Sequence, residues 1–336
     1  MLTILAFRSQ KPSTKNAIAV TVSAEYFDVS CLFMDSLNRN YPDHPDIVVC
    51  YQGFTSRHIN HLTKSSSRIR FLDIDEFAIS EGPGMRHRDE LFNLKVFYPR
   101  QVIWTDLFDD YEVVLYLDSD LLVLSPLDHL FETTSVKIFA EAYQGADQVL
   151  YSSRLHQWLP LLEEDGIADR AGQSAANAGV MAISRRYRTP AQFQRLVMIQ
   201  ERYGPYLAWG DQSMFNIWMW FNGLEPEHDF RHNFQVRLLK QGREAEAYRD
   251  ACILHLNGWG ATGLLPHAMQ MASVLLSSGA TGRRLFATYD RMLRNRTFQK
   301  VALRGWTDLF GRMFWHFKDY DPKAFSEVPV KAGHAR

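Results

Sequence analysis

Hydrophobic positions near the start of the chain form short runs that alternate with a helix-like segment. Residues 17–23 are apolar and β-branched, which is typical of a strand, and residues 29–38 have the spacing of an amphipathic helix. Two more strands are expected at residues 47–51 and 68–74, because turn residues separate these runs from their neighbours. This order predicts strand-helix-strand units.

A buried central strand is expected just before residue 118. Residues 91–107 resemble a helix, and residues 112–117 form a nearly continuous apolar run, as in a parallel strand covered on both faces. We therefore expect an α/β fold with a mostly parallel central sheet flanked by helices. Ligands bind beyond the carboxyl ends of the strands in such sheets, so the chemistry should follow Leu117.

Asp118 and Asp120 follow that run and are the first candidates for a metal site. Two residues apart at a strand end, their carboxylates can lean to one side and bind Mg²⁺ or Mn²⁺, and an added imidazole would favour Mn²⁺. Such an ion could stabilise a leaving diphosphate. Two other Asp-x-Asp triplets occur, at residues 73–75 and 319–321. The pair alone therefore fits a solvated strand-end turn equally well.

Four sequence blocks in order give this pair a context. They are VLYLDSDLLV at residues 114–123, NAGV at 177–180, GDQ at 210–212 and ILHLNG at 253–258. In order and rough spacing the chain resembles glycosyltransferase family 8, and the resemblance covers about residues 17–265. It implies a GT-A fold, which is a Rossmann-like, mixed and mostly parallel sheet. It also implies a nucleotide-sugar donor, usually UDP-linked, with Mn²⁺ and retention of the anomeric configuration.

The resemblance also implies roles for single residues. Asp118 and Asp120 would bind the metal ion, and His255 would complete its coordination. Asp118 would also contact the nucleotide-sugar donor. Without the resemblance, a lone histidine on an apolar strand is more often a core residue. Residues 20–26 fall where the family's first strand receives the nucleobase. The candidate contacts there are Thr21, Ser23 and Tyr26, the last by stacking its ring on the base.

The donor sugar would be held by residues of the middle blocks. By resemblance these are Asn177, with Gly179 beside it, and the catalytic candidates Asp211 and Gln212. Residues 177–179 could instead be a tight turn, since glycine permits a positive φ and a close backbone approach. Asp211 could also cap the helix that follows it, and capping does not exclude sugar binding.

One cation of the family pattern is missing. Relatives place a Lys that contacts the donor diphosphate in the closing block, and this chain has none there. Lys95 is the first candidate to replace it, and Arg100 is the second, because a proline indicates a helix boundary just before it. Arg86 and Arg88, in a Gly- and Pro-containing loop, are a further pair. Each could equally be an ordinary surface cation.

Composition and charge exclude other classes of protein. The chain has 336 residues with 37 Lys and Arg against 38 Asp and Glu, so the basic field needed for general nucleic-acid binding is absent. Its three cysteines are far apart, which predicts neither a disulfide framework nor a thiolate metal site, and indicates a reducing compartment. The histidine pairs His58/His61 and His228/His232 lack the Glu of a metalloprotease motif and are expected at the surface.

The chain is expected to contain a catalytic domain at residues 15–270 and a basic, aromatic helical extension at 271–336. Residues 283–318 could lie on an anionic lipid surface, or their aromatic side chains could pack on the catalytic domain. The first residues do not resemble a signal peptide, and no apolar run reaches the length of a spanning helix. We expect a cytoplasmic protein, with peripheral contact at the inner face of a membrane.

The first functional interpretation is a metal-dependent retaining transferase. It would move a hexose from a UDP-hexose to a glycan or lipid-linked saccharide, as in lipopolysaccharide biosynthesis. A non-catalytic or weakly hydrolytic nucleotide-sugar-binding relative stays open, because the family's Lys is missing. A nucleotidyltransferase is less well supported, since the first strand lacks the Gly-rich loop of that group.

Overall fold

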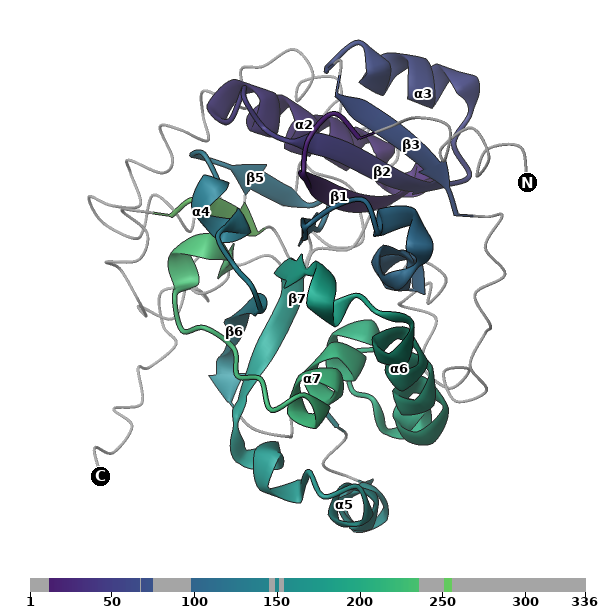
Figure 1. Ribbon diagram of the computed structural model, residues 1–336, viewed down its shortest axis with the longest axis vertical. Helices are drawn as coiled ribbons and strands as arrows, with labels where there is room; N and C mark the ends of the chain where they lie inside the picture. Colours follow the sequence, from purple (N-terminus) through teal and green to yellow (C-terminus); the bar gives the residue numbers. More distant parts are fainter. Residues whose placement is uncertain are drawn as a thin grey trace, which may run out of the picture.

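The computed structural model describes residues 12–66, 68–74, 98–144, 149–150, 154–235 and 251–255. In these residues the chain forms a mixed central sheet of six strands, a smaller sheet of three strands, and helices packed around them (Figure 1). The expected α/β class with a mostly parallel central sheet is therefore confirmed.

The central sheet has the strand order β3-β2-β1-β4-β7-β6. Strands β1 to β4 run parallel, β7 is antiparallel to β4, and β6 is antiparallel to β7. The sequence predicted the first four of these strands to within a few residues. The strand bounds are Asn16–Ser23 for β1, Asp46–Gln52 for β2, Ile69–Asp73 for β3, Val113–Leu117 for β4, Val136–Gln144 for β6 and Ser174–Ser184 for β7.

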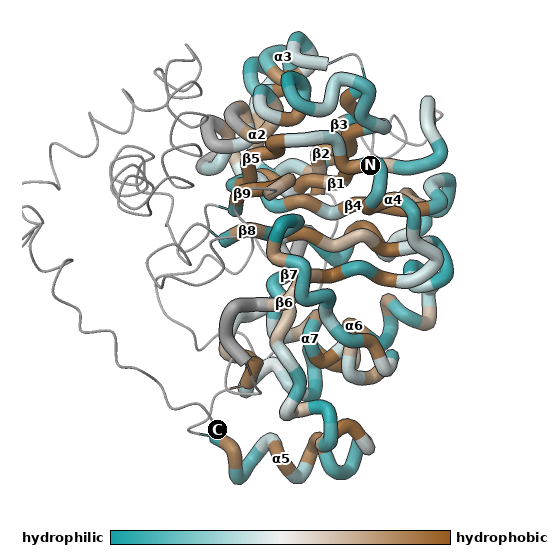
Figure 2. Tube along the Cα trace, turned by 90° about the vertical axis from the view of Figure 1, so that its left-hand side faces the viewer, coloured by the Kyte–Doolittle hydropathy of each residue, from teal (hydrophilic) through white to brown (hydrophobic). Residues whose placement is uncertain are grey.

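Both faces of the central sheet are buried under helices. Because side chains alternate along a strand, Ile18 and Val20 of β1 enter one hydrophobic cluster, whereas Ala17 and Ala19 enter the other. Figure 2 shows hydrophobic residues concentrated on the strands and hydrophilic ones along much of α3. The α-helices are α2 (Phe27–Asn40), α3 (Ser56–Thr63), α4 (Asp128–Phe131), α5 (Leu155–Glu164), α6 (Pro190–Tyr203) and α7 (Asp211–Phe221).

The two faces carry different helices. The cluster that contains Ile18 also contains residues of α2, such as Phe33, and Leu62 of α3. The cluster that contains Ala17 includes Trp104 and residues of α5, α6 and α7. Figure 1 shows α2 and α3 beside β1 to β3, and α6 and α7 beside β7. Helices on both faces protect the parallel strands from water.

Short 3-10 helices connect many of these elements. The helix expected at residues 91–107 is, in its described part, two 3-10 helices, η4 (Tyr98–Trp104) and η5 (Asp106–Phe108), so no long α-helix is formed there. Pro99 lies in the first turn of η4, where its missing N–H costs nothing. The others are η1 (Ala24–Tyr26), η8 (Ala168–Gly172), η9 (Arg185–Tyr187), η10 (Gly204–Tyr206) and η11 (Phe230–His232).

The smaller sheet joins segments that are far apart in the sequence. Its order is β5-β9-β8, with bounds Leu121–Val123, Ile253–His255 and Phe234–Gln235. Strands β5 and β9 are antiparallel and pair Leu121 with His255. This pairing places the end of β9 next to the residues that follow β4.

Strand β7 was not expected from its small residues. Asn216 of α7 binds it through the backbone of Ala176, accepting from the N–H at 2.7 Å and donating to the carbonyl at 2.9 Å. Both residues are buried, so these bonds satisfy backbone groups that water cannot reach. The small side chains and Asn216 together let α7 dock closely on the strand.

Several predictions fall on other parts of the chain. The domain boundary at residue 270 and the extension at 271–336 lie outside the described residues. No helix in the described ranges is both long enough and apolar enough to cross a membrane. The expected surface position is wrong for His232, which is only 8% exposed, whereas His61 and His228 are exposed.

Replacing Asn216 by Ala should destabilise the protein. The change leaves the buried N–H and C=O of Ala176 without their partner, at about 1–3 kcal/mol for each group, so we expect the free energy of unfolding to fall by about 2–4 kcal/mol. Urea unfolding followed by circular dichroism would measure this. Asn60→Ala, on the exposed face of α3, is the control, and an equal loss in both variants would contradict the docking role.

Candidate active site

Two carboxylates and one imidazole meet beyond the end of β4. Asp118 and Asp120 follow this strand, and the pairing of β5 with β9 brings His255 beside them. The Nε2 atom of His255 lies 3.7 Å from Oδ2 of Asp118 and 3.4 Å from Oδ1 of Asp120. One ligand atom from each residue lies within 4.8 Å of the other two, so a single cation could contact all three.

Asp118 is held on several sides. Tyr116 precedes it by two residues in β4 and therefore points to the same side, where its hydroxyl donates to Oδ1 of Asp118 at 2.9 Å. Arg100 pairs with the same oxygen at 2.8 Å, and the Asp118 N–H donates to the carbonyl of Gly179. The carboxylate is thus fixed before any ligand binds.

Arg100 joins Asp118 to Asp211. Arg100 is buried, and its Nε atom lies 3.1 Å from Oδ2 of Asp211. The same Nε–H donates to the Tyr116 hydroxyl at 2.9 Å. Burial raises the pKa of Asp211 to about 7 against the opposing effect of Arg100. Burial likewise raises the pKa of Asp118, and the nearby Asp120 carboxylate adds to the rise. The site holds more carboxylates than Arg100 alone can compensate.

A chain of side-chain amides orients His255. The Gly179 backbone N–H can only donate, and it donates to Asn177 at 3.0 Å, which identifies the accepting atom as Oδ1. Asn177 Oδ1 also accepts from Nδ2 of Asn233 at 2.9 Å. The Oδ1 of Asn233 therefore faces Nδ1 of His255, at 2.8 Å, and this ring nitrogen must carry the proton.

It follows that the neutral His255 ring directs the lone pair of Nε2 toward Asp118 and Asp120. Three acceptor atoms then face one another and repel. A divalent cation between them, or a proton on Nε2, relieves this repulsion. Burial opposes the ionisation of Asp120, but a His255 ring that also carries a proton on Nε2 is cationic, and its charge and hydrogen bond keep the pKa of Asp120 below its usual range. The donor set, the excess negative charge and the ring orientation all fit a hard divalent ion.

Gly179 makes room for His255. A Cβ atom at this position would overlap Cε1 of the His255 ring, and it would come within 2.9 Å of both Nδ1 of that ring and Oδ1 of Asn177. Residues 177–179 lie inside β7, so the alternative of a tight turn is wrong. The close backbone approach that glycine permits is what the site uses.

Asp211 and Gln212 open helix α7 beside this network. Gly210, with φ of 54°, is the N-cap residue, so Asp211 does not cap the helix and lies in its first turn. Gln212 accepts through Oε1 from Nδ2 of Asn177 at 3.1 Å. This contact leaves the Nε2 group of Gln212 as the end of the amide that can donate to a ligand.

The candidate nucleobase contacts lie at the end of β1, next to β4. The Thr21 hydroxyl is buried and lies 2.7 Å from the Tyr116 hydroxyl. Ser23 Oγ is buried without a hydrogen-bond partner in the part of the chain that the structure describes, so it fits a ligand contact. Tyr26 is half-buried in η1. Their contact with a base stays a prediction.

Sequence reasoning offered Arg100 as a second candidate for the diphosphate, whereas the structure pairs it with Asp118 and Asp211. The first candidate, Lys95, lies outside the described residues together with Arg86 and Arg88. Two residues of the site were missed. Tyr116 was missed, although the period of two along a strand places it on the side of Asp118. Asn233 was missed because nothing in its local sequence marks it.

Two of three comparisons with known proteins give matches, and these two agree. The model of the family described as "Glycosyl transferase family 8" matches residues 17–262. A structure of the galactosyltransferase LgtC in complex with donor and acceptor sugar analogs is 20% identical, covers 77% of this chain and 94% of that chain, and has a TM-score of 0.51. No curated protein sequence matches the chain.

Two further structures are similar. An active-site mutant of LgtC is 19% identical, with 78% of this chain and 95% of that chain covered and a TM-score of 0.52. The bifunctional glycosyltransferase WbbM is 15% identical, with 75% of this chain and 48% of that chain covered and a TM-score of 0.56. At such identities the structures show a shared GT-A fold, and the family model matches most of the chain. The chain therefore belongs to glycosyltransferase family 8 and is a glycosyltransferase.

Proposed function

We propose that the protein transfers a hexose from a UDP-hexose to a glycan or lipid-linked saccharide, with Mn²⁺ bound and with retention at the anomeric carbon. The observation that carries the proposal is the convergence of Asp118, Asp120 and the Nε2 atom of His255. The donor and acceptor sugar analogs bound to the similar LgtC structure support a nucleotide sugar and a saccharide as the two substrates.

In this proposal Asp118, Asp120 and His255 hold the metal ion. Two carboxylates with one imidazole are a donor set that suits Mn²⁺ better than Mg²⁺. The bound ion would neutralise the diphosphate and stabilise it as a leaving group. Arg100 keeps the Asp118 carboxylate in place through its contact with Oδ1, which leaves Oδ2 on the side of His255.

The donor would lie along the carboxyl end of β1 and across β7. Thr21, Ser23 and Tyr26 are the proposed nucleobase contacts, and Asn177 and Gly179 the proposed contacts to the sugar. The partnerless hydroxyl of Ser23 among the described residues supports the first group. Lys95, proposed for the diphosphate, rests on the sequence alone.

For the reaction we favour departure of the diphosphate and arrival of the acceptor hydroxyl on the same face of the sugar, with the departing diphosphate accepting the hydroxyl proton. A covalent intermediate would need a carboxylate nucleophile, and Asp211 is paired with Arg100. Gln212 is a poor nucleophile, but its Nε2 group could donate to the sugar while Asn177 holds its Oε1 atom. Electrostatic stabilisation of the leaving group would then dominate the rate.

Membrane contact rests on the sequence alone. We propose that the cations and aromatic residues of 283–318 hold a cytoplasmic protein at the inner face of a membrane, near lipid-linked acceptors of lipopolysaccharide synthesis. The full chain should sediment with vesicles that contain phosphatidylglycerol and less with neutral ones, and a chain that ends at Ser278 should not. Equal sedimentation of both chains would contradict this role.

Replacing Asp120 by Asn should abolish most turnover. The change removes one charged ligand. Because losing a residue that only orients a metal ligand already costs about 10–100-fold, we expect UDP release from UDP-glucose or UDP-galactose with Mn²⁺ to fall by at least about 100-fold. Asp43→Asn is the control, because this exposed residue precedes β2 and so lies at the end of the parallel strands opposite to Asp120. Equal, metal-independent UDP release by wild type and Asp120→Asn would exclude the role of Asp120.

Replacing Gly179 by Ala should weaken Mn²⁺ binding without unfolding the protein. The added methyl group displaces the His255 ring from its place over β7, so we expect the dissociation constant of Mn²⁺ to rise by about 10–100-fold. Electron paramagnetic resonance of free Mn²⁺ would measure it. The control is Gly172→Ala, where a Cβ meets nothing within 4 Å. Unchanged affinity in Gly179→Ala would remove His255 from the metal site.

A further inference from the structure

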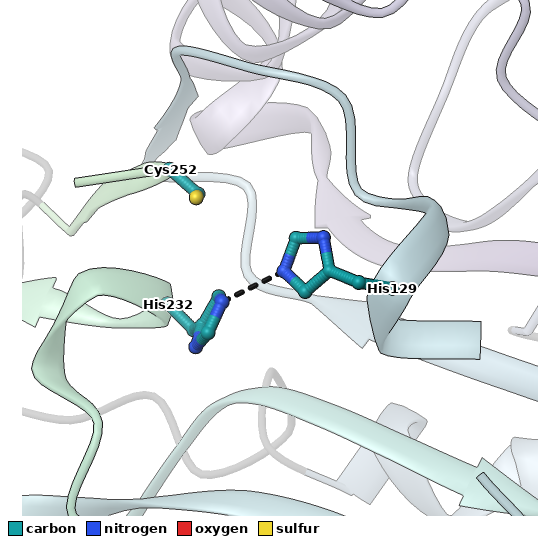
Figure 3. A group of neighbouring side chains, drawn as sticks. All are labelled: His129, His232 and Cys252. Carbon is teal, nitrogen blue, oxygen red and sulfur yellow. Dashed lines mark hydrogen bonds between the residues drawn. The ribbon is translucent and has the colours of Figure 1, made fainter. Parts of the chain in front are cut away.

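A second cluster of metal-binding side chains lies outside the active site. His129 comes from α4, His232 ends η11, and Cys252 directly precedes β9. The Nε2 atoms of the two histidines are 2.7 Å apart, and one ligand atom from each of the three residues lies within 4.8 Å of the other two. Figure 3 shows the two rings facing each other and the sulfur of Cys252 directed toward the same space.

This cluster is separate from the residues around Asp118. Cys252 and His255 are three positions apart on an extended segment, and because side chains alternate along a strand, the two point to opposite sides. The active-site ligands and this cluster have no residue in common. The cluster therefore requires an explanation of its own.

We propose that His129, His232 and Cys252 bind a Zn²⁺ ion that braces the segments leading to the active site. A thiolate with two imidazoles is a donor set that selects zinc over Mn²⁺ or Mg²⁺. Three protein ligands leave a fourth position, which water can fill because His129 and Cys252 are only partly buried. The prediction of no thiolate site considered the cysteines alone, without histidine partners.

The protonation of the two rings suits metal binding. Burial lowers the pKa of His232 to about 4 and also lowers that of His129, so both rings are neutral at pH 7. Between two neutral rings one Nε2 donates and the other accepts, and a cation replaces that shared proton. With zinc–nitrogen distances of about 2.0–2.1 Å, the two nitrogen atoms must separate to roughly 3.3 Å, a small shift of the rings.

A carboxylate lies behind the His232 ring. Oδ2 of Asp229 is 3.4 Å from Nδ1 of His232, on the far side of the ring from Nε2. Coordination through Nε2 puts the ring proton on Nδ1, where it faces Asp229, and metal-binding histidines are commonly oriented in this way. This buried Nδ1 has no hydrogen bond among the described residues, and the ring needs only a small movement to make one.

Two cations lie near the cluster, but each has its own contact. Lys137 donates to the carbonyl oxygen of His129 at 3.0 Å, and Arg231 is paired with Asp229. The Asp229 carboxylate brings a negative charge to the same region, and Cys252 would add a second one on losing its thiol proton to bind a metal ion. The local charge therefore does not oppose a divalent ion.

The cluster is connected to the active site through the backbone. His232 is followed by Asn233, whose Oδ1 faces His255, and Cys252 lies three residues before His255 itself. The Cys252 N–H also donates to the carbonyl of Arg231 at 2.8 Å. A zinc ion here would tie both segments to α4, so we expect two metals of different kinds in one molecule.

The test uses Co²⁺ as a spectroscopic substitute for zinc in the metal-free full-length protein. A thiolate ligand gives a sulfur-to-cobalt charge-transfer band in the near ultraviolet, which a site of carboxylates and one imidazole does not give. We expect one equivalent of Co²⁺ to produce this band and Zn²⁺ to remove it. The band should persist in Asp120→Asn, which changes only the active-site cluster.

The variants that decide the assignment are Cys252→Ala and His232→Gln. Both should lose the band, whereas the controls Cys31→Ala and His228→Gln should keep it, since Cys31 lies in the core and His228 is an exposed neighbour. Should Cys252→Ala fail to fold, the wild-type spectrum alone still decides. A wild-type protein without a thiolate band, or a band that survives in Cys252→Ala, would overturn the proposal.

Discussion

The short antiparallel pairing of β5 with β9 is the interaction on which the active site depends. It sets Leu121 opposite His255 and so brings the imidazole to the two carboxylates that follow β4. Three residue pairs are a weak sheet by themselves, but the bond from the Leu124 N–H to the Cys252 carbonyl extends the pairing, and β8 adds a third strand. The central sheet fixes Asp118, and the smaller sheet delivers the residue that meets it.

A buried ionic network makes the site part of the core. Arg100 lies between Asp118 and Asp211, and it contacts the hydroxyl of Tyr116 near the end of β4. Burying these charges is costly, and their mutual contacts repay the cost only in this geometry. The network therefore favours one arrangement of η4, β4 and α7. The rise in the pKa of Asp211 to about 7 is the residual cost of its burial.

The early strands could be predicted because runs of apolar residues are local signals. The convergence of Asp118 with His255 was predicted only through the resemblance to family 8, since His255 taken alone looks like a core residue. The sequence did not identify β7, whose Ala and Gly residues have low strand propensity and are small because His255 and α7 pack so closely. Asn233 and His232 stand in an irregular segment without a periodic pattern. Arg100 lies in η4, and no local signal in the sequence gives the tertiary position of that helix.

The amide side chains in the site are needed because each must both donate and accept. Asn177 accepts from Gly179 and Asn233 and donates to Gln212, whereas Asn233 donates to Asn177 and accepts from His255. A carboxylate could accept but not donate, and it would add charge beside Asp118 and Asp120. Because the Gly179 N–H has a single possible role, it sets the direction of every later bond. The backbone of β7 thus determines that Nδ1 of His255 carries a proton, while Nε2 faces the carboxylates.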